Sequence, residues 1–286
     1  MYVILITSML TSLDVVWTWT NSSDSSDNRV REWNELYHSI RLFKKYSVNY
    51  NRLIVVTPHN VQPSFKNIFG VEYVDRNKFA DNFPNSQNSY VLEFQLHKLI
   101  KLKKLTKTIM YLNDDWFITQ KFDVVQHCNA GYCQENWGRF GYHYNGHDTF
   151  VGAMTTTNRA LKRQFKNFKP TNQMAHVPFC VRIDTMKYIW KHFDVIGSMS
   201  DRRANHNFQF QYLHALTDRY AFGRSFRRCD YHFVMNNGPI SNIENNFERV
   251  LRTTKLFLCI NDDIENKYLK YRELILTMYN KFLYKL

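Results

Sequence analysis

Residues 108–115 read Thr-Ile-Met-Tyr-Leu-Asn-Asp-Asp, and this stretch decides the fold class. A short, β-prone apolar run ends abruptly in an amide and two carboxylates. The phrase returns near the end of the chain, where the apolar residues 256–260 lead into Asn261-Asp262-Asp263. Open α/β sheets place their ligand crevice beyond the carboxyl ends of the strands. The repeated phrase therefore predicts acidic side chains at such a crevice.

Two interpretations of Asp114 and Asp115 follow from their chemistry. Carboxylate pairs hold hard divalent cations such as Mg²⁺ or Mn²⁺, which prefer oxygen ligands. Asn-Asp sequences are also common in turns, because both side chains bond their own backbone. Adjacent side chains of a strand face opposite ways, so we expect one carboxylate to ligate directly and the other to orient water or loop backbone.

The pattern outside these phrases alternates between strands and helices. We predict strands at 13–19, 52–57, 71–74, 108–112 and 255–260, and helices at 30–46, 88–102, 157–168, 183–193, 207–220 and 267–286. Such alternation favours parallel strands joined by right-handed crossovers. We therefore predict one α/β domain over residues 1–286, with a Rossmann-like, mostly parallel sheet flanked by helices. Residues 117–153 are aromatic-rich and irregular, as expected of hairpins and loops over the sheet edge.

The formal net charge of +13 implies an anionic partner: nucleic acid, a membrane surface, a nucleotide or an acidic polymer. No helix-turn-helix or RNA-binding signature is present, so we expect no nucleic acid. No segment is long and apolar enough for a transmembrane helix, which leaves peripheral membrane contact open. Each local cluster of bases is also explained as a solvated helix or loop face. The clusters are Lys101, Lys103, Lys104 and Lys107; Arg159, Lys162, Arg163 and Lys166; and Arg224, Arg227 and Arg228.

Five cysteines are present, an odd number with no evident disulfide framework. Cys128 and Cys133, with three histidines nearby, offer a loosely spaced zinc site, but no second cysteine pair follows. Reduced thiols in a reducing compartment are the simpler interpretation, and we expect a cytoplasmic location. The triplet Asn21-Ser22-Ser23 fits a glycosylation sequon, which matters only in a lumenal or secretory location.

Four segments resemble, in order, the sequence blocks of the Stealth family. The first, Leu-Asp-Val-Val-Trp-Thr-Trp-Thr-Asn, is similar to the family's opening block, which reads roughly IDVVYTWVNG. The later segments carry the matching Glu-Leu, Ser-Ile-Arg, Asn-Ser, Tyr-Leu-Asn-Asp-Asp, Ala-His-Val-Pro and Cys-Ile-Asn-Asp runs. In order along the chain, the segments are 13–21, 31–115, 175–210 and 259–262.

The resemblance implies a reaction. Stealth proteins include bacterial capsule polymerases and the eukaryotic N-acetylglucosamine-1-phosphotransferase. Their activity implies transfer of a sugar 1-phosphate from a nucleotide diphosphate sugar, here a UDP-sugar, to a hydroxyl of a glycan acceptor. A phosphodiester forms and a nucleoside monophosphate leaves, so the step is a phosphoryl transfer.

Such a step needs a divalent metal, a cation that grips phosphate and a proton acceptor. Asp114, Asp115 and Asp262 are the expected metal ligands. Arg203, placed by its match to the third block, can grip phosphate bidentately. His176 is the expected base, because imidazole titrates near neutral pH; an acid of the first Asn-Asp-Asp is the alternative base.

Donor binding is expected at the carboxyl end of the first strand. Trp19 lies there and either stacks on a base or packs in the core. Asp14 opens that strand, at the wrong end for direct chemistry. The expected donor-binding residues are Thr18, Trp19, Asn21, Arg31, Arg41, Asn88 and Asn261.

Two rival functions stay open at this point. A metal-dependent glycosyltransferase also uses acids and a nucleotide-sugar, but it releases a nucleoside diphosphate. A non-catalytic module could instead bind an anionic polymer through its positive charge. The two acidic phrases weigh against that module, because acids without a metal would repel a polyanion.

Overall fold

The structure is a computed structural model of the 286-residue chain. It describes residues 12–19, 34–58, 68–83, 86, 88–134, 149–171, 173–200, 204–236, 240–252, 254–262, 273, 276–277, 280–281 and 284.

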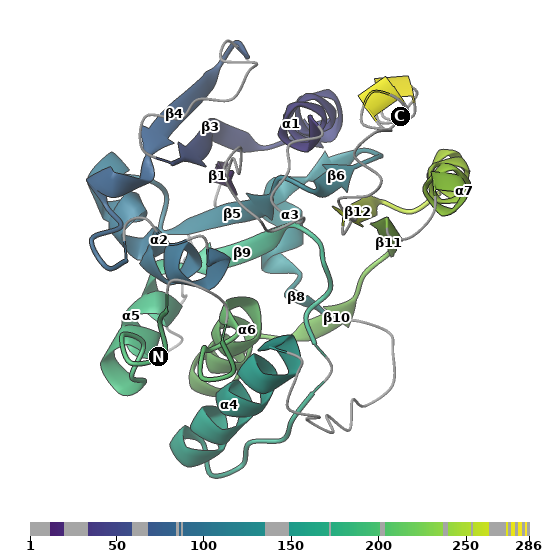
Figure 1. The fold of residues 1–286 in the computed structure, drawn as a ribbon. Helices are drawn as coiled ribbons and strands as arrows, with labels where there is room; N and C mark the ends of the chain where they lie inside the picture. Colours follow the sequence, from purple (N-terminus) through teal and green to yellow (C-terminus); the bar gives the residue numbers. More distant parts are fainter. Residues whose placement is uncertain are drawn as a thin grey trace, which may run out of the picture.

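A five-stranded sheet forms the centre of the molecule (Figure 1). Its strands run in the order β4 (Val71–Asp75), β3 (Tyr50–Thr57), β1 (Leu13–Thr18), β5 (Thr108–Asn113) and β9 (Phe179–Arg182). The first four are mutually parallel, and β9 pairs antiparallel with β5. β1 and β5 are buried along nearly their whole length, because a parallel sheet is covered on both faces. The predicted α/β fold with a mostly parallel sheet is confirmed.

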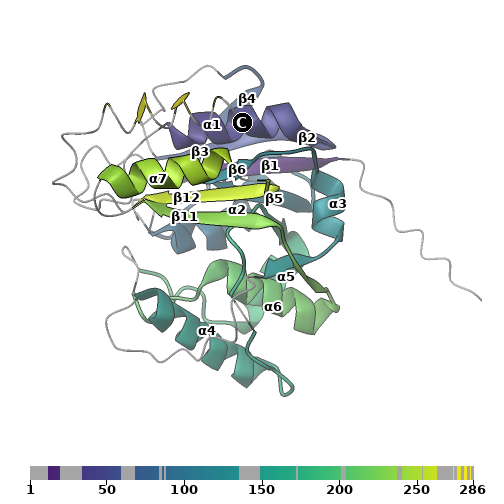
Figure 2. The same cartoon turned by 90° about the vertical axis from the view of Figure 1, so that its right-hand side faces the viewer.

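Helices cover both sides of this sheet (Figure 2). α1 (Glu35–Tyr46) lies above it, and α2 (Ser89–Lys103) lies below. Beneath α2 is a lower layer of α4 (Thr149–Gln164), α5 (Ile183–His192) and α6 (Phe210–Phe222). The short helix η2 (Arg76–Lys78) follows β4, and α3 (Val124–Asn129) follows β7. The helix α7 (Ile240–Leu251) precedes β12. None of the described helices is long and apolar enough to cross a bilayer.

A second sheet of three strands extends the fold. It has the order β11 (Tyr231–Asn236), β12 (Phe257–Asp262) and β6 (Trp116–Ile118), with β12 parallel to β11 and antiparallel to β6. Two small parallel pairs complete the strands: β2 (Ser47–Val48) with β7 (Phe122–Asp123), and β8 (Tyr132–Gln134) with β10 (Phe226–Arg228).

Most predicted elements are present with shifted ends, but several observed elements were not predicted. Among them are β9, β11 and α7; β9 has only four residues, too few for a clear alternation. The segment 117–153 is more regular than expected, since it contains β7, α3, β8 and the start of α4. Residues 135–148 and most of the predicted helix at 267–286 lie outside the described residues.

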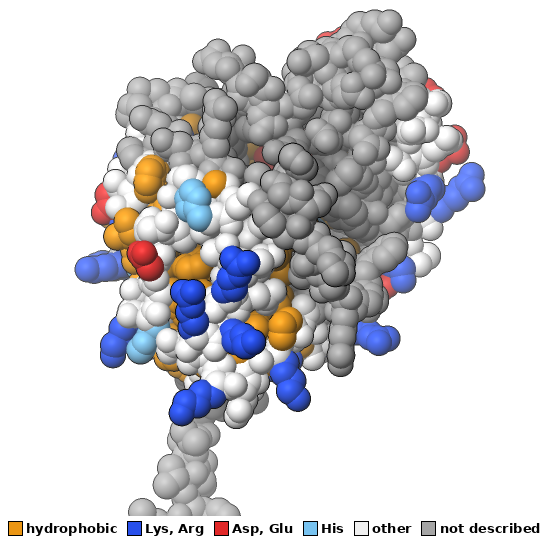
Figure 3. Space-filling view, turned by 60° about the horizontal axis from the view of Figure 1, so that its bottom comes forward, with side chains coloured by type: hydrophobic (Ala, Val, Ile, Leu, Met, Phe, Trp, Pro, Cys, Tyr) orange, Lys and Arg blue, Asp and Glu red, His pale blue; other side chains and the backbone are white. Residues whose placement is uncertain are grey.

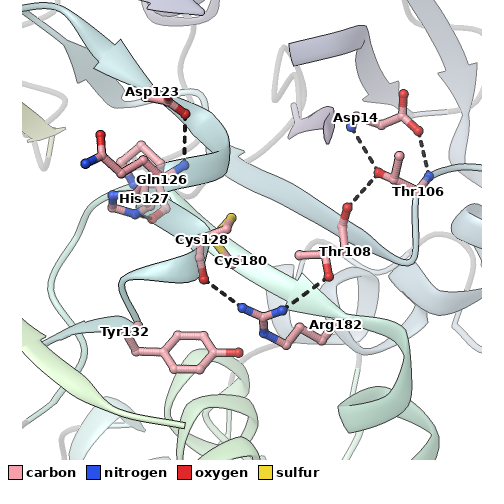
Figure 4. Close-up of a disulfide and its surroundings, with 12 residues drawn as sticks. Asp14, Thr106, Thr108, Asp123, Gln126, His127, Cys128, Tyr132, Cys180 and Arg182 are labelled. Carbon is pink, nitrogen blue, oxygen red and sulfur yellow. Dashed lines mark hydrogen bonds between the residues drawn. A yellow bond between two sulfur atoms is a disulfide. The ribbon is translucent and has the colours of Figure 1, made fainter. Parts of the chain in front are cut away.

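The amino edge of the sheet is held by the buried carboxylate of Asp14, at the start of β1. Arg52 of β3 donates to both of its oxygens at 2.9 Å, and the backbone N–H of Thr106 donates at 2.7 Å. Figure 4 shows the contact with Thr106, which lies in the turn before β5. One carboxylate therefore joins three segments that are distant in sequence.

Burial alone would raise the pKa of Asp14. The hydrogen bonds from Arg52 and from the Thr106 backbone, together with the charge of Arg52, outweigh burial and hold the pKa below the usual 3.8. Asp14 therefore stays ionised at the amino edge, consistent with the structural role expected from its position.

Four of the five cysteines form disulfides, which corrects the prediction of reduced thiols. Cys128, in α3, pairs with Cys180 of β9 (Figure 4), and Cys133 of β8 pairs with Cys229 just after β10. Their Cα atoms lie 5.5 and 5.4 Å apart, within the usual range for a disulfide. The zinc alternative is also wrong, because both of its cysteines are bridged. The tertiary fold brings together partners that are 52 and 96 residues apart, so no local cysteine spacing could predict the pairs.

Replacing Arg52 with methionine should destabilise the protein by about 2–3 kcal/mol at pH 7, because the buried carboxylate of Asp14 loses its partner. This loss is smaller than the full cost of breaking a buried ion pair, because Arg52 is partly exposed. A group with a depressed pKa stabilises the fold above its unfolded pKa, and this contribution disappears as the pH falls through the folded pKa. Urea unfolding should therefore show a gap between wild type and variant at pH 7 that narrows near pH 3. Lys101→Met, an exposed substitution on α2, is the control. Equal stability of wild type and Arg52→Met at pH 7 would contradict this role.

Candidate active site

The sheet reverses its strand order between β1 and β5. From β1 the chain adds β3 and then β4 on one side, and it returns to place β5 on the other. The register sets Thr18 opposite Asn113, so both strands end at the same level. Ligands of open α/β sheets bind in the crevice outside the carboxyl ends at such a switch point. This edge of the sheet is therefore the candidate active site.

Asp114 and Asp115 lie at this edge, in the two-residue turn that joins β5 to β6. Tyr111 and Leu112 before them are fully buried, whereas both aspartates are partly exposed. The turn interpretation of the phrase is thus correct. It leaves the metal interpretation open, because both carboxylates lie at the crevice end of the sheet, although Oδ1 of Asp115 is itself buried.

The second acidic phrase meets the first. β12 runs antiparallel to β6, with Cys259 opposite Trp116, and the N–H of Ile260 donates to the carbonyl oxygen of Asp115 at 3.1 Å. The thiol of Cys259 lies 3.4 Å from a carboxylate oxygen of Asp115. The backbone of Asn261 and Asp262 therefore ends β12 beside the first acidic turn. The side chains of these last two residues lie outside the description.

α1 holds the acidic turn in place through Ser39. The indole N–H of Trp17 donates to the Ser39 hydroxyl at 3.0 Å, and that hydroxyl donates to the carbonyl of Trp116 at 2.5 Å. All three residues are buried. Because Trp116 directly follows Asp115, this relay links the position of the acidic turn to β1.

Tyr111 also holds the site together, although the sequence pattern identifies it only as part of a strand. Its hydroxyl lies 2.9 Å from Thr18 Oγ1, 2.5 Å from Asn113 Oδ1 and 2.9 Å from Glu93 Oε1. Burial, reinforced by the negative charge of Glu93, raises the pKa of Tyr111 well above 10, so the hydroxyl keeps its proton. A tyrosine inside an aliphatic strand was the available signal, because a buried phenol needs a polar partner.

His176 reaches the same edge from β9. This strand is antiparallel to β5 and sets Phe179 opposite Tyr111, so the residues before Phe179 lie at the carboxyl end of β5. His176 is partly exposed, and hydrogen bonds on either side, from Ala175 to Cys133 and from Val177 to Ala175, hold its backbone. The extended conformation expected before Pro178 leads into a strand rather than directly into a helix.

Of the expected donor-binding residues whose side chains the structure describes, Thr18 lies at the site, whereas Trp19, Asn88 and Arg41 are placed differently. Trp19 is 3% exposed and packs in the core. Asn88 is buried and caps α2, accepting from the N–H of Tyr90 and donating to Asn207. Arg41, on α1, places its guanidinium 4.5 Å from the ring centre of Tyr284.

Three expected site residues lie outside the described residues: Asn21, Arg31 and Arg203. Their roles stay predictions, as do the side-chain roles of Asn261 and Asp262.

The described residues fit a metal only as part of its coordination shell. No group of three His, Cys, Asp or Glu side chains within the described ranges could hold an ion alone. Mg²⁺, however, is usually held by one or two carboxylates and completes its shell with water and substrate phosphates. Asp114 and Asp115 supply such oxygens, so the edge suits Mg²⁺ or Mn²⁺ that binds together with a phosphate group.

Comparisons with known proteins give weak likenesses. No protein-family model and no curated protein matches the chain. Among solved structures, an active-site mutant of LgtC has a TM-score of 0.44 at 9% identity, covering 94% of this chain and 96% of that chain. Mouse xyloside xylosyltransferase 1 in its apo form has 0.42 at 9%, covering 86% and 97%. The galactosyltransferase LgtC with donor and acceptor sugar analogues has 0.41 at 10%, covering 94% and 96%. Likenesses at this level assign neither a family nor an activity.

Proposed function

We propose that the chain transfers a sugar 1-phosphate from a nucleotide diphosphate sugar to a hydroxyl of a glycan acceptor. The observation that carries this proposal is the meeting of both acidic phrases at the β1/β5 switch point, where Ile260 bonds Asp115. His176, from the neighbouring β9 segment, lies at the same edge. Oxygen ligands and an imidazole together suit phosphoryl transfer.

In the proposed reaction, the acceptor oxygen attacks the β-phosphorus of the donor. The bond between that phosphorus and the oxygen bridging to the α-phosphate breaks, and the nucleoside monophosphate leaves with the electron pair. His176 takes the proton of the attacking hydroxyl. The product is a sugar attached through a phosphodiester, and the bond at the anomeric carbon is untouched.

The remaining charge rests on the phosphoryl oxygens, and catalysis of such a step is mostly positioning and neutralisation. Asp114 and Asp115, with Asp262, would hold the Mg²⁺ or Mn²⁺ that supplies positive charge to these oxygens. Arg203 would grip phosphate through its planar fork. Thr18, which Tyr111 holds at the end of β1, would contact the donor.

The two rivals differ from this proposal in identifiable ways. A glycosyltransferase would use the same edge but break the bond between the anomeric carbon and oxygen, releasing a nucleoside diphosphate. A non-catalytic binding module would need no acids at the edge, and it would release no nucleotide.

Donor labelled with ¹⁸O at the anomeric oxygen separates the two enzyme reactions. With a UDP-sugar and Mg²⁺, we expect the label in the product phosphodiester and UMP as co-product. His176→Ala should slow transfer by about 10²–10⁴-fold with little change in donor binding, because a positioned base contributes about that much. Mass spectrometry of the product and of the released nucleotide is the measurement.

Label found on released UDP would mean attack at carbon, and the phosphotransferase proposal would be abandoned. Label in the product with a fully active His176→Ala variant would keep the reaction and move the base to an acid of the first phrase.

Asp115→Asn should weaken Mg²⁺ binding and abolish turnover while leaving the fold intact, because the amide keeps the shape of the side chain but loses its charge. Calorimetric titration of Mg²⁺ in the presence of UDP, alongside the transfer assay, tests this. Asp184→Asn, which removes one exposed acid on α5, is the matched control and should behave as wild type. Unchanged metal binding and activity in Asp115→Asn would remove this residue from the metal site.

The compartment is a second part of the proposal. The cytoplasmic location was inferred from reduced thiols, and the disulfides remove that premise. Structural disulfides persist in oxidising environments and are rare in the cytosol. We infer that the chain works in an oxidising compartment, the lumenal or secretory alternative left open by the sequence.

Thiol titration of denatured protein, taken from its native source and alkylated on lysis, should find one free cysteine, Cys259. Prior reduction should raise the count to all five. Reduction should also destabilise the fold by about 2–4 kcal/mol for each bridge, because each closes a long loop. Five free thiols without reduction would contradict the oxidising compartment.

A further inference from the structure

A basic surface covers the lower layer of helices. Figure 3 views the molecule from this side and shows Lys and Arg side chains across it, with few acids. We call the exposed bases of α4, α5, α6 and the turns that follow them the basic face. Its members are Arg159, Lys162, Arg163, Lys166, Lys169, Lys187, Lys191, Arg219 and Arg224.

The charge of the basic face is hardly compensated by acids. Elsewhere on the described surface, Arg52, Lys103 and Lys255 pair with carboxylates at 2.6–2.9 Å, and Lys98 pairs with Asp81. On the basic face, among the described residues, only Lys187 forms an ion pair, with Asp184 at 3.9 Å. Close like charges repel one another, so an uncompensated group of bases attracts an anionic partner.

Aromatic rings lie among these bases. Phe165 is stacked between Tyr188, at 6.1 Å and 12°, and Tyr220, at 5.4 Å and 24° between ring planes. These rings are half-buried, so they lie level with the surface rather than projecting from it. The apolar C–H face of a sugar packs well on an aromatic ring, and Lys and Arg bond phosphate, sulfate or carboxylate. Rings bordered by bases therefore suit a carbohydrate that carries negative charge.

We propose that the basic face binds an anionic glycan, separately from the site at the sheet edge. The proposal rests on the proposed function for the identity of its partner, because each sugar 1-phosphate transfer adds one negatively charged phosphodiester. A chain that has received several such units is a polyanion that many bases can hold at once. The basic face would then retain the growing acceptor between transfers.

Two other polyanions fit the face less well. Binding in a membrane interface needs a continuous apolar surface, but the exposed large apolar side chains here are Phe222 on α6 and Ile196 after α5. Nucleic acid is a poor match to a protein with two disulfides, since these persist in oxidising compartments.

The test measures binding of dextran sulfate, with neutral dextran and with vesicles of phosphatidylcholine and phosphatidylglycerol in equal parts as alternatives. One variant removes three bases of α4 and its following turn: Lys162→Ala, Arg163→Ala and Lys166→Ala. The matched control removes three exposed bases elsewhere: Lys101→Ala, Lys107→Ala and Lys121→Ala. Both variants lose the same charge, and thermal unfolding checks that both remain folded.

We expect the α4 variant to bind dextran sulfate at least about tenfold more weakly. The slope of log K against log salt concentration should be smaller by about 2, because the three lost contacts no longer release counterions. The control should change less than about twofold, and neutral dextran should not bind. Equal weakening in both variants would reduce the effect to net charge and overturn the proposal. Binding to the vesicles but not to dextran sulfate would assign the face to a membrane and overturn it as well.

These measurements use no donor, so their outcome is independent of catalysis. Selective loss of dextran sulfate binding in a protein that transfers no sugar phosphate would keep the basic face and reject the proposed function. Transfer with unselective binding would do the reverse. In an active enzyme, the α4 variant should raise KM for a long phosphodiester-bearing acceptor and leave kcat and the KM for a short neutral acceptor unchanged.

Discussion

A buried carboxylate at the start of β1 is the constraint on which the central sheet depends. Asp14 has no exposure to solvent, so its charge is tolerable only while Arg52 and the Thr106 backbone remain bonded to it. Those bonds align β1, β3 and the entry to β5 at the amino edge. The same three strands then run in parallel, so alignment at one edge sets where Thr18 and Asn113 end at the other.

The candidate site is built from side chains that support one another across the sheet. Tyr111 joins the ends of β1 and β5 to Glu93 of α2, and Ser39 of α1 joins β1 to Trp116, next to the acidic turn. The Tyr111 and Ser39 hydroxyls are buried and hydrogen bonded, as burial requires. The carboxylates of the acidic turn are therefore held by rigid strands and helices, which suits precise placement of phosphate and metal.

Charge is divided between two parts of the molecule. Asp114 and Asp115 lie at the carboxyl edge of the sheet, while the exposed bases of α4, α5 and α6 lie on the surface of the lower layer (Figure 3). The Cys128–Cys180 bridge ties β9, the strand next to this layer, to α3, and the Cys133–Cys229 bridge ties β8 to the segment after β10. Covalent links of this kind restrict the unfolded chain and so keep the strand beneath the site in register.

The sequence by itself determined the fold class and two central strands, predicted at 13–19 and 108–112 and observed at 13–18 and 108–113, because periodicity acts locally along the chain. It also placed Asp14 at the structural end of its strand. Only the tertiary structure decided that β9 runs antiparallel and brings His176 to the carboxyl edge of the sheet, that the second acidic phrase meets the first, and that four cysteines pair. It also showed that Trp19 takes the core alternative of its two expected roles and that Asn88 caps a helix. Sheet register and chain reversal decide such contacts, and they leave no periodic signal in the residues that make them.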